Sequence, residues 1–163
     1  MNILTLDPGT THTAWMLYDT ARQLPVKFDW VENSDILVIL ENNGGDLSFN
    51  HVVCEGIQSY GMPVGRETFE TCIWIGRFMQ LADNRVPFQI MYRRDVKLNL
   101  CNSVRAKDSN VRQALLDRFP ATGGGKTPQV GTKAARGPLY GVSKHVWSTL
   151  AIAVTWCDCA RLD

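Results

Sequence analysis

The sequence has no long hydrophobic run and no paired set of metal-binding cysteines. No stretch approaches the roughly 18 consecutive apolar residues of a transmembrane helix, so a membrane span is not expected. Residues 3–6 already have the pattern of a buried strand, with no basic segment or apolar signal core before them, which predicts a cytoplasmic location. The cysteines lack the second Cys or His pair of a zinc site, so we expect reduced, buried thiols at Cys54, Cys72, Cys101, Cys157 and Cys159.

Charge is nearly balanced over the whole chain but not along it. The 163 residues carry a net charge of +1, and a content of 45% hydrophobic and 20% charged residues is typical of a folded domain rather than a disordered chain. Residues 1–92 hold 5 Lys and Arg against 11 Asp and Glu, whereas residues 93–144 hold 11 against 3. An acidic half followed by a basic segment indicates a polyanionic partner such as nucleic acid, although a solvated surface gives the same pattern.

Apolar periodicity predicts one α/β domain over residues 1–163. Strand patterns come first and are followed by alternating helix and strand patterns, which is typical of a mixed sheet flanked by helices. In one expected helix, Phe69, Ile73, Phe78 and Leu81 have nearly helical spacing. The expected strands are 2–7, 12–19, 25–31, 51–55 and 88–92, and the expected helices are 34–42, 66–83, 94–101, 107–119 and 143–160.

A glycine-rich, basic loop is expected at residues 121–141, before the last helix. Its 21 residues are too many for a passive connection, so the loop is either functional or disordered. Residues 123–127 (GGGKT) are similar to the end of a nucleotide-binding P-loop, but Pro120 stands where that motif needs glycine and no strand precedes it. Nucleotide binding is therefore not expected.

Two acidic residues stand at the ends of apolar strands. Asp7 follows residues 3–6 (ILTL), and Glu55 follows residues 52–54 (VVC). Neighbouring strands lie about 4.8 Å apart, so the two carboxylates can share one cation if their strands are adjacent. Such hard oxygen ligands suit Mg²⁺, whereas a helix cap or an arginine partner is the alternative for either residue alone.

Four segments, in order, resemble the RuvC-type Holliday-junction resolvases of the RNase H-like superfamily. Residues 3–11 (ILTLDPGTT) resemble the opening strand of that family, and residues 53–55 (VCE) resemble its second acidic strand. Residues 95–97 and 106–111 resemble its basic helical segments, and residues 148–155 resemble its closing helix, usually written Asp-Ala-Leu-Ala-x-Ala. The long glycine-rich loop is more similar to phage-encoded members, which act in the host cytoplasm.

The resemblance implies an RNase H-like fold with a central five-stranded mixed sheet and metal-dependent hydrolysis of phosphodiester bonds in DNA. It places four catalytic positions on two strand ends and on one face of the last helix, here at Asp7, Glu55, His145 and Ser148. Asp7 would bridge two Mg²⁺ ions about 3.5–4 Å apart, with Glu55 holding one ion and His145 the other. Imidazole ligation favours Mn²⁺ as a substitute.

Ser148 departs from this pattern, because the family commonly has Asp at both helix positions. A neutral hydroxyl is a poor Mg²⁺ ligand, and the next acidic residue, Asp158, is ten residues away, about 15 Å further along a helix. His145 is an accepted ligand type at its position, and a surface histidine at the helix start is the alternative. The sequence thus predicts either a reduced ligand set or weakened catalysis.

The basic segment is expected to contact the phosphates of branched DNA. Lys97 and Lys107 fall within the matching segments, and a solvated helix face is the alternative for each basic residue. Tyr60 lies in the loop where the family places residues that probe or stack at the branch point. The other expected phosphate contacts are Arg93, Arg94, Arg105, Arg112, Lys126, Lys133, Arg136 and Lys144.

These observations predict a Mg²⁺-dependent endonuclease that cleaves Holliday junctions and other branched DNA. A symmetric four-way substrate needs paired cuts, so a homodimer is expected. Two alternatives remain open: a branched-DNA-binding protein with little catalysis, and an RNase H-like nuclease acting on RNA.

Overall fold

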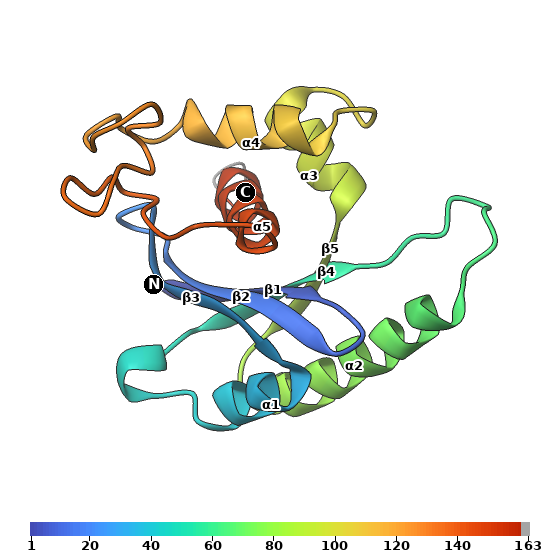
Figure 1. Cartoon of the computed structure of the whole chain (residues 1–163). Helices are drawn as coiled ribbons and strands as arrows, with labels where there is room; N and C mark the ends of the chain where they lie inside the picture. The colour runs from blue at the N-terminus through green and yellow to red at the C-terminus, as the bar shows by residue number, and fades with distance from the viewer. Residues whose placement is uncertain (161–163) are drawn as a thin grey trace.

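Five strands form one mixed sheet in the order β3-β2-β1-β4-β5 (Figure 1). Strand β2 runs antiparallel to β1 and β3, whereas β4 and β5 run parallel to β1 and to each other. The expected strands are confirmed to within one residue at each end. In the computed structural model, which describes residues 1–160, the strands are β1 (Asn2–Pro8), β2 (His12–Asp19), β3 (Leu24–Glu32), β4 (His51–Gly56) and β5 (Phe88–Tyr92).

Helices cover both faces of the sheet (Figure 1). On one face lie α1 (Asn33–Glu41), which follows β3 directly, and α2 (Arg66–Asp83). The short 3₁₀ turn η1 (Gly45–Leu47) lies between α1 and β4. On the other face α5 (Val146–Cys159) packs directly on β1, β2 and β4. Beyond it lie α3 (Arg93–Cys101) and α4 (Asp108–Leu116). No helix within residues 1–160 is long and apolar enough to cross a membrane.

Strand alternation divides the core into two clusters and fixes the direction of the acidic residues. Successive side chains of a strand point to opposite faces, so Leu4 and Leu6 of β1 pack towards α1 and α2 while Ile3 packs towards α5. In β4 the same alternation places Val53 on the α5 side. Asp7 and Glu55 lie an even number of residues after Ile3 and Val53, so both carboxylates face α5.

Helix α5 begins three residues later than the sequence pattern predicts. Lys144 has a left-handed backbone with φ of 42°, which is incompatible with an α-helix, and His145 is the residue that caps the helix. The helical turns therefore begin at Val146 rather than at residue 143. Ser148 remains in the first turn.

The expected apolar face of α2 is only partly buried. Phe78 lies fully in the core, but Phe69 and Ile73 are 60% and 64% exposed, and Thr71 and Ile75 are buried in their place. Spacing alone predicted a helix correctly but not which of its apolar side chains face the sheet. The helix thus leaves apolar side chains in solvent.

The backbone of the 121–141 loop folds back on itself. Its amides and carbonyls bond to each other, as in Gly123 N–H to Pro128 O at 2.8 Å and Gly137 N–H to Val130 O at 3.0 Å. The backbone packs so closely that a Cβ on Gly137 would lie 2.3 Å from the carbonyl oxygen of Pro128. Glycine is required there by space.

The expectation of buried thiols is right for some cysteines only. Cys54 is fully buried in β4 as a free thiol, and burial raises the pKa of this thiol well above its usual value. Cys72 and Cys159, by contrast, are exposed free thiols, which corrects the prediction for these two residues.

Candidate active site

Three charged residues meet at one edge of the sheet because the parallel strands β1, β4 and β5 end there. Leu6 pairs with Cys54 in the parallel register, so Asp7 and Glu55 follow side by side. Gly56 pairs with Tyr92, and Arg93 comes directly after that pair. Carboxyl ends of parallel strands are the common location of binding sites in open α/β sheets.

The two carboxylates lie close enough to alter each other's ionisation. Burial raises the pKa of Asp7, although hydrogen bonding to Ser148 and the charge of Arg93 oppose this change. Burial together with the charge of Asp7 raises the pKa of Glu55 to about 7, again against the charge of Arg93. The site therefore concentrates more negative charge than its single adjacent arginine balances.

Helix α5 brings Ser148 to this pair. The hydroxyl of Thr5 in β1 donates to the carbonyl of Thr149 at 3.0 Å, within the buried core, and this bond fixes the first turn of α5 against β1. Ser148 hydrogen-bonds Asp7, and its Oγ lies 3.5 Å from Nη1 of Arg93. The structure thus brings together three of the four predicted catalytic residues: Asp7, Glu55 and Ser148.

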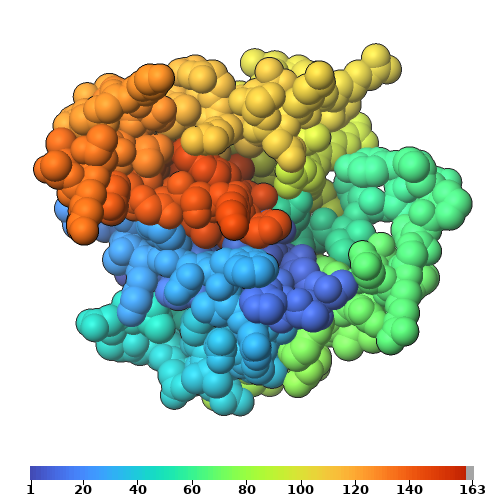
Figure 2. All heavy atoms as spheres, in the orientation of Figure 1, coloured from blue at the N-terminus to red at the C-terminus, as the bar shows by residue number. Residues whose placement is uncertain are grey.

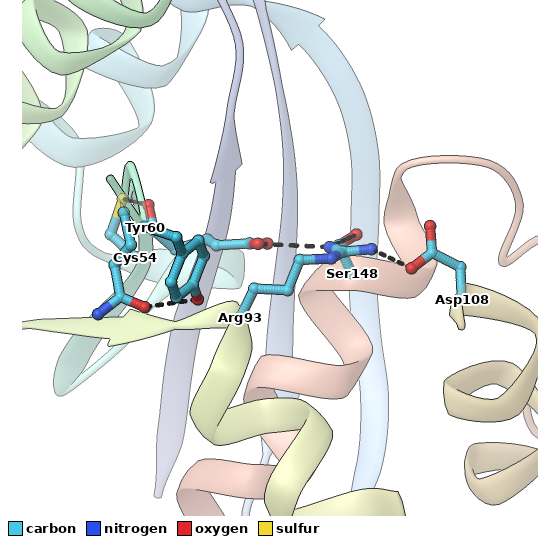
Figure 3. A network of polar contacts seen from close by, with 7 residues as sticks. Cys54, Tyr60, Arg93, Asp108 and Ser148 are labelled. Carbon is cyan, nitrogen blue, oxygen red and sulfur yellow. Dashed lines mark hydrogen bonds and ion pairs between the residues drawn. The ribbon is translucent and has the colours of Figure 1, made fainter. Parts of the chain in front are cut away.

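Arg93 connects the acidic pair to helix α4 (Figure 3). Its Nη1 lies 3.3 Å from Oε1 of Glu55, and its Nη2 donates to Oδ1 of Asp108 at 2.6 Å. The sequence predicted Arg93 only as a phosphate contact and gave Asp108 no role. The position of Arg93 directly after the expected strand 88–92 was the signal that places it at the same edge as Asp7 and Glu55.

His145 lies beside a different group of residues. Its ring stacks on Trp30 of β3 with centroids 5.6 Å apart, and Trp30 in turn stacks on His12 at 4.3 Å. Within residues 1–160, no group of three or more His, Cys, Asp or Glu side chains is arranged to hold a metal ion. The metal-binding role of His145 stays a prediction.

A pocket of about 100 Å³ opens beside the acidic pair and is rimmed by basic side chains. Glu55 and Ser148 form one side, and Lys97, Arg112 and Lys144 contribute to the rim. The guanidinium of Arg112 also lies over the ring of Trp147, 4.8 Å from its centroid. Anionic groups are therefore attracted to the mouth of the pocket, next to the carboxylates.

A second groove of about 420 Å³ lies on the other side of Arg93 and brings Tyr60 close to basic residues. Tyr60 is exposed, with its hydroxyl bonded to Gln58 at 2.7 Å, and it lines the groove with Arg94 and Lys97. In Figure 2 the green segment around residue 60 projects from the body of the molecule. This arrangement combines an aromatic ring with three cations, because Arg93 lines the groove as well.

The remaining predicted DNA contacts are exposed and lie in two separate places. Arg105 and Lys107 precede α4, close to Asp108, whereas the 121–141 loop lies at the opposite end of α4 (Figure 1). That loop carries Lys126, Lys133 and Arg136, the last with its guanidinium 4.6 Å from the ring centroid of Tyr140. The basic segment therefore extends along the whole α4 side of the molecule.

The donor atoms of the site fit a hard divalent cation. Asp7 and Glu55 offer adjacent carboxylate oxygens, and Ser148 adds a hydroxyl oxygen. Carboxylate and neutral oxygen ligands are those preferred by Mg²⁺. The strands also hold two carboxylates close together, and a cation bound between them stabilises their charged forms.

Solved structures share this architecture. The structure of Thermus thermophilus RuvC is 17% identical in sequence, with a TM-score of 0.63 over 99% of this chain and 96% of that chain. T. thermophilus RuvC in complex with a Holliday junction substrate gives a TM-score of 0.68 at the same identity and coverage. Comparisons of the sequence with protein-family models and with curated proteins find no match. The chain therefore has the RNase H-like fold of RuvC.

Proposed function

We propose that this protein is a Mg²⁺-dependent endonuclease that cleaves Holliday junctions and other branched DNA. The observation that carries the proposal is the Asp7–Glu55 pair, held at the carboxyl edge of a RuvC-like sheet beside a rim of basic side chains. A solved RuvC with this fold is bound to a Holliday junction substrate, which favours branched DNA as the substrate of this chain also.

In this function, Asp7 and Glu55 hold the cation and Ser148 orients Asp7 by hydrogen bonding. A divalent cation held by these carboxylates would supply the chemistry of activating a water and stabilising the leaving oxygen. Lys97, Arg112 and Lys144 attract the DNA backbone to the pocket mouth, where such contacts position the strand without reading its sequence. Tyr60 offers a ring on which an unpaired base at the branch point can stack.

We propose that the active form is a homodimer. A four-way junction has two strands to cut, and a twofold dimer presents two identical sites to them. The exposed Phe69 and Ile73 of α2 lie one helical turn apart on a helix that covers the opposite face of the sheet from α5. A buried twofold contact through these side chains leaves both active sites open.

The function is tested by cleavage of an end-labelled four-way junction with and without Mg²⁺, beside linear duplex and RNA–DNA hybrid substrates. We expect Mg²⁺-dependent nicks in the junction. Asp7→Asn should abolish them while junction binding stays equal or becomes stronger, because a cation ligand and a charge that repels phosphate are both removed. Asp46→Asn, an exposed change in η1, is the matched control.

One observation favours a second candidate, a branched-DNA-binding protein with little catalysis. Ser148 adds no charge to the site, and Arg93 already neutralises part of the acidic pair. Tight junction binding without cleavage in either Mg²⁺ or Mn²⁺ would select this candidate. Preferential cleavage of the RNA–DNA hybrid would instead indicate an RNA-directed nuclease.

A further inference from the structure

Arg93 lies against the acidic pair. Its guanidinium contacts Glu55, Ser148 and Asp108 at the same time, at 3.3, 3.5 and 2.6 Å (Figure 3). The Arg93 side chain is 42% exposed, whereas that of Glu55 is only 13% exposed. The arginine is therefore the more accessible partner of this ion pair, and it lines the same pocket as Glu55.

The charges of the site explain why an arginine is held there. Asp7 and Glu55 are both desolvated by burial, the charge of Asp7 raises the pKa of Glu55, and Arg93 is the cation whose charge acts on both of them. Ser148 is neutral, and His145 is stacked on Trp30. A positive group beside two carboxylates that the strands hold together stabilises their negative charge, as a metal ion at that place would.

The contacts of Arg93 are also unequal. The bond to Asp108 at 2.6 Å is shorter than the contact with Glu55 at 3.3 Å, and charge-assisted bonds of the shorter kind are the stronger ones. The guanidinium can therefore release Glu55 while Asp108 still holds it against the N-terminus of α4. Such a movement frees a carboxylate oxygen of Glu55 to bind a cation, while the Arg93 side chain stays held by Asp108.

We propose that Arg93 is the internal counter-ion of the Asp7–Glu55 pair and competes with the divalent cation for Glu55. This inference rests on the proposed function, in which the pair holds that cation. Arg93 acts through Glu55 and is thus a positioning residue that sets the metal affinity of the site. Cation binding and release of Arg93 towards Asp108 become one coupled event.

The test is Mn²⁺ binding to the DNA-free protein, followed by electron paramagnetic resonance of the free ion. Arg93→Gln should bind Mn²⁺ about tenfold more tightly than the wild type, because a unit positive charge next to the ion is removed. Arg94→Gln removes the same charge one residue away, at an exposed position of α3, and should leave the affinity within about twofold. Arg93→Lys keeps the positive charge without the planar guanidinium, and its Mn²⁺ affinity should stay close to that of the wild type.

Equal Mn²⁺ affinities of Arg93→Gln and Arg94→Gln would overturn the inference, and so would weaker binding by Arg93→Gln. Thermal unfolding of each variant shows that it is folded, and Arg93→Met, which also removes the charge and should also bind Mn²⁺ more tightly, replaces the glutamine variant if that variant is unfolded. Junction cleavage is measured separately. Tighter Mn²⁺ binding by Arg93→Gln without cleavage by any variant supports the inference while rejecting the nuclease, whereas wild-type cleavage with unchanged Mn²⁺ affinity rejects the inference alone.

Discussion

Asp7 and Glu55 lie together because the two buried strands that carry them pair, not because the carboxylates attract each other. The buried apolar residues of β1 and β4 fix how the two strands pair. Asp7 and Glu55 each come directly after the last residue pair, Leu6 and Cys54. Burial raises the pKa of both groups, and the charge of Asp7 raises the pKa of Glu55 further, which is a cost to the folded state. The site is thus a place where stability is given up for binding capacity.

Because of this cost, the stability contributed by Glu55 should fall as pH rises. The pKa of Glu55 is raised from 4.5 to about 7 in the folded state, so protonated Glu55 stabilises the fold and this contribution is lost as pH rises from about 4.5 through 7. The full loss is about 3 kcal/mol at most. Glu55→Gln should therefore raise the melting temperature at pH 8 without divalent cations, and the difference should vanish towards pH 4.5.

Differential scanning calorimetry across this pH range measures the effect. Glu32→Gln, at an exposed position at the end of β3, is the control and should show no such pH-dependent difference. Added Mg²⁺ should stabilise the wild type at pH 8 more than Glu55→Gln. A lower melting temperature of Glu55→Gln at pH 8 would mean that the ion pair with Arg93 outweighs the burial cost.

Ser148 offers a direct test of the ligand set. Its hydroxyl faces Asp7 and Arg93, so an aspartate there points into the same site. Ser148→Asp should raise the cleavage rate at limiting Mg²⁺, because each anionic oxygen strengthens the attraction for the ion. With only two carboxylates, the wild type should bind Mg²⁺ weakly and work better in Mn²⁺. Cleavage rates over both metal concentrations measure this, and unchanged metal dependence would show that position 148 is not a ligand position.

At the scale of the elements, strand patterns in the sequence predicted most of what positions the site. The apolar runs before Asp7 and Glu55 predicted the strands, and adjacency of β1 and β4 then placed the two acids together. The contact of Arg93 with Glu55 was not predicted, because it depends on β5 lying next to β4, a pairing that no local pattern specifies. The start of α5 was missed because the left-handed backbone occurs at a lysine, a residue type that does not indicate a helix break.

The 121–141 loop shows how composition can mislead about order. Its glycines allow the backbone to fold on itself, and Gly131 sits at φ of 80° with Ala135 O and Gly137 N closely packed against it. We predict that this rigid loop presents Lys133 and Arg136 to DNA in a fixed arrangement. A flexible loop of the same composition would lose more entropy on binding.

Gly137→Ala tests the rigid loop, because the new Cβ would collide with backbone carbonyls that cannot move independently. We expect a lower melting temperature and about a fivefold or greater loss of junction affinity. Gly44→Ala is the matched control, since its backbone is extended and its Cβ meets open space. Fluorescence anisotropy with a labelled junction reports the affinity. Unchanged binding by a destabilised Gly137→Ala would show that the loop serves the fold and not the DNA.

At the scale of the whole molecule, the acidic and basic parts of the sequence have become two sides of one site. The acidic half supplies the strand carboxylates, and the basic segment 93–144 supplies α3, α4 and the glycine-rich loop that surround them. A net charge of +1 conceals this separation. In the proposed function, attraction for DNA and repulsion beside the carboxylates would therefore coexist, and a bound cation would offset the repulsion.

The basic side should make junction binding strongly dependent on salt, because each phosphate contact releases counterions. Lys97 lines both grooves beside Arg93, and Lys107 is exposed just before α4, so Lys97→Ala and Lys107→Ala should each weaken binding and reduce the slope of log affinity against log salt by about one unit. Lys27→Ala, on β3, lies outside the basic segment and should leave the slope unchanged. Anisotropy titrations from low to moderate salt give the slopes. Unchanged slopes in both Lys97→Ala and Lys107→Ala would place the DNA on another face, because a phosphate contact cannot be lost without returning its counterion.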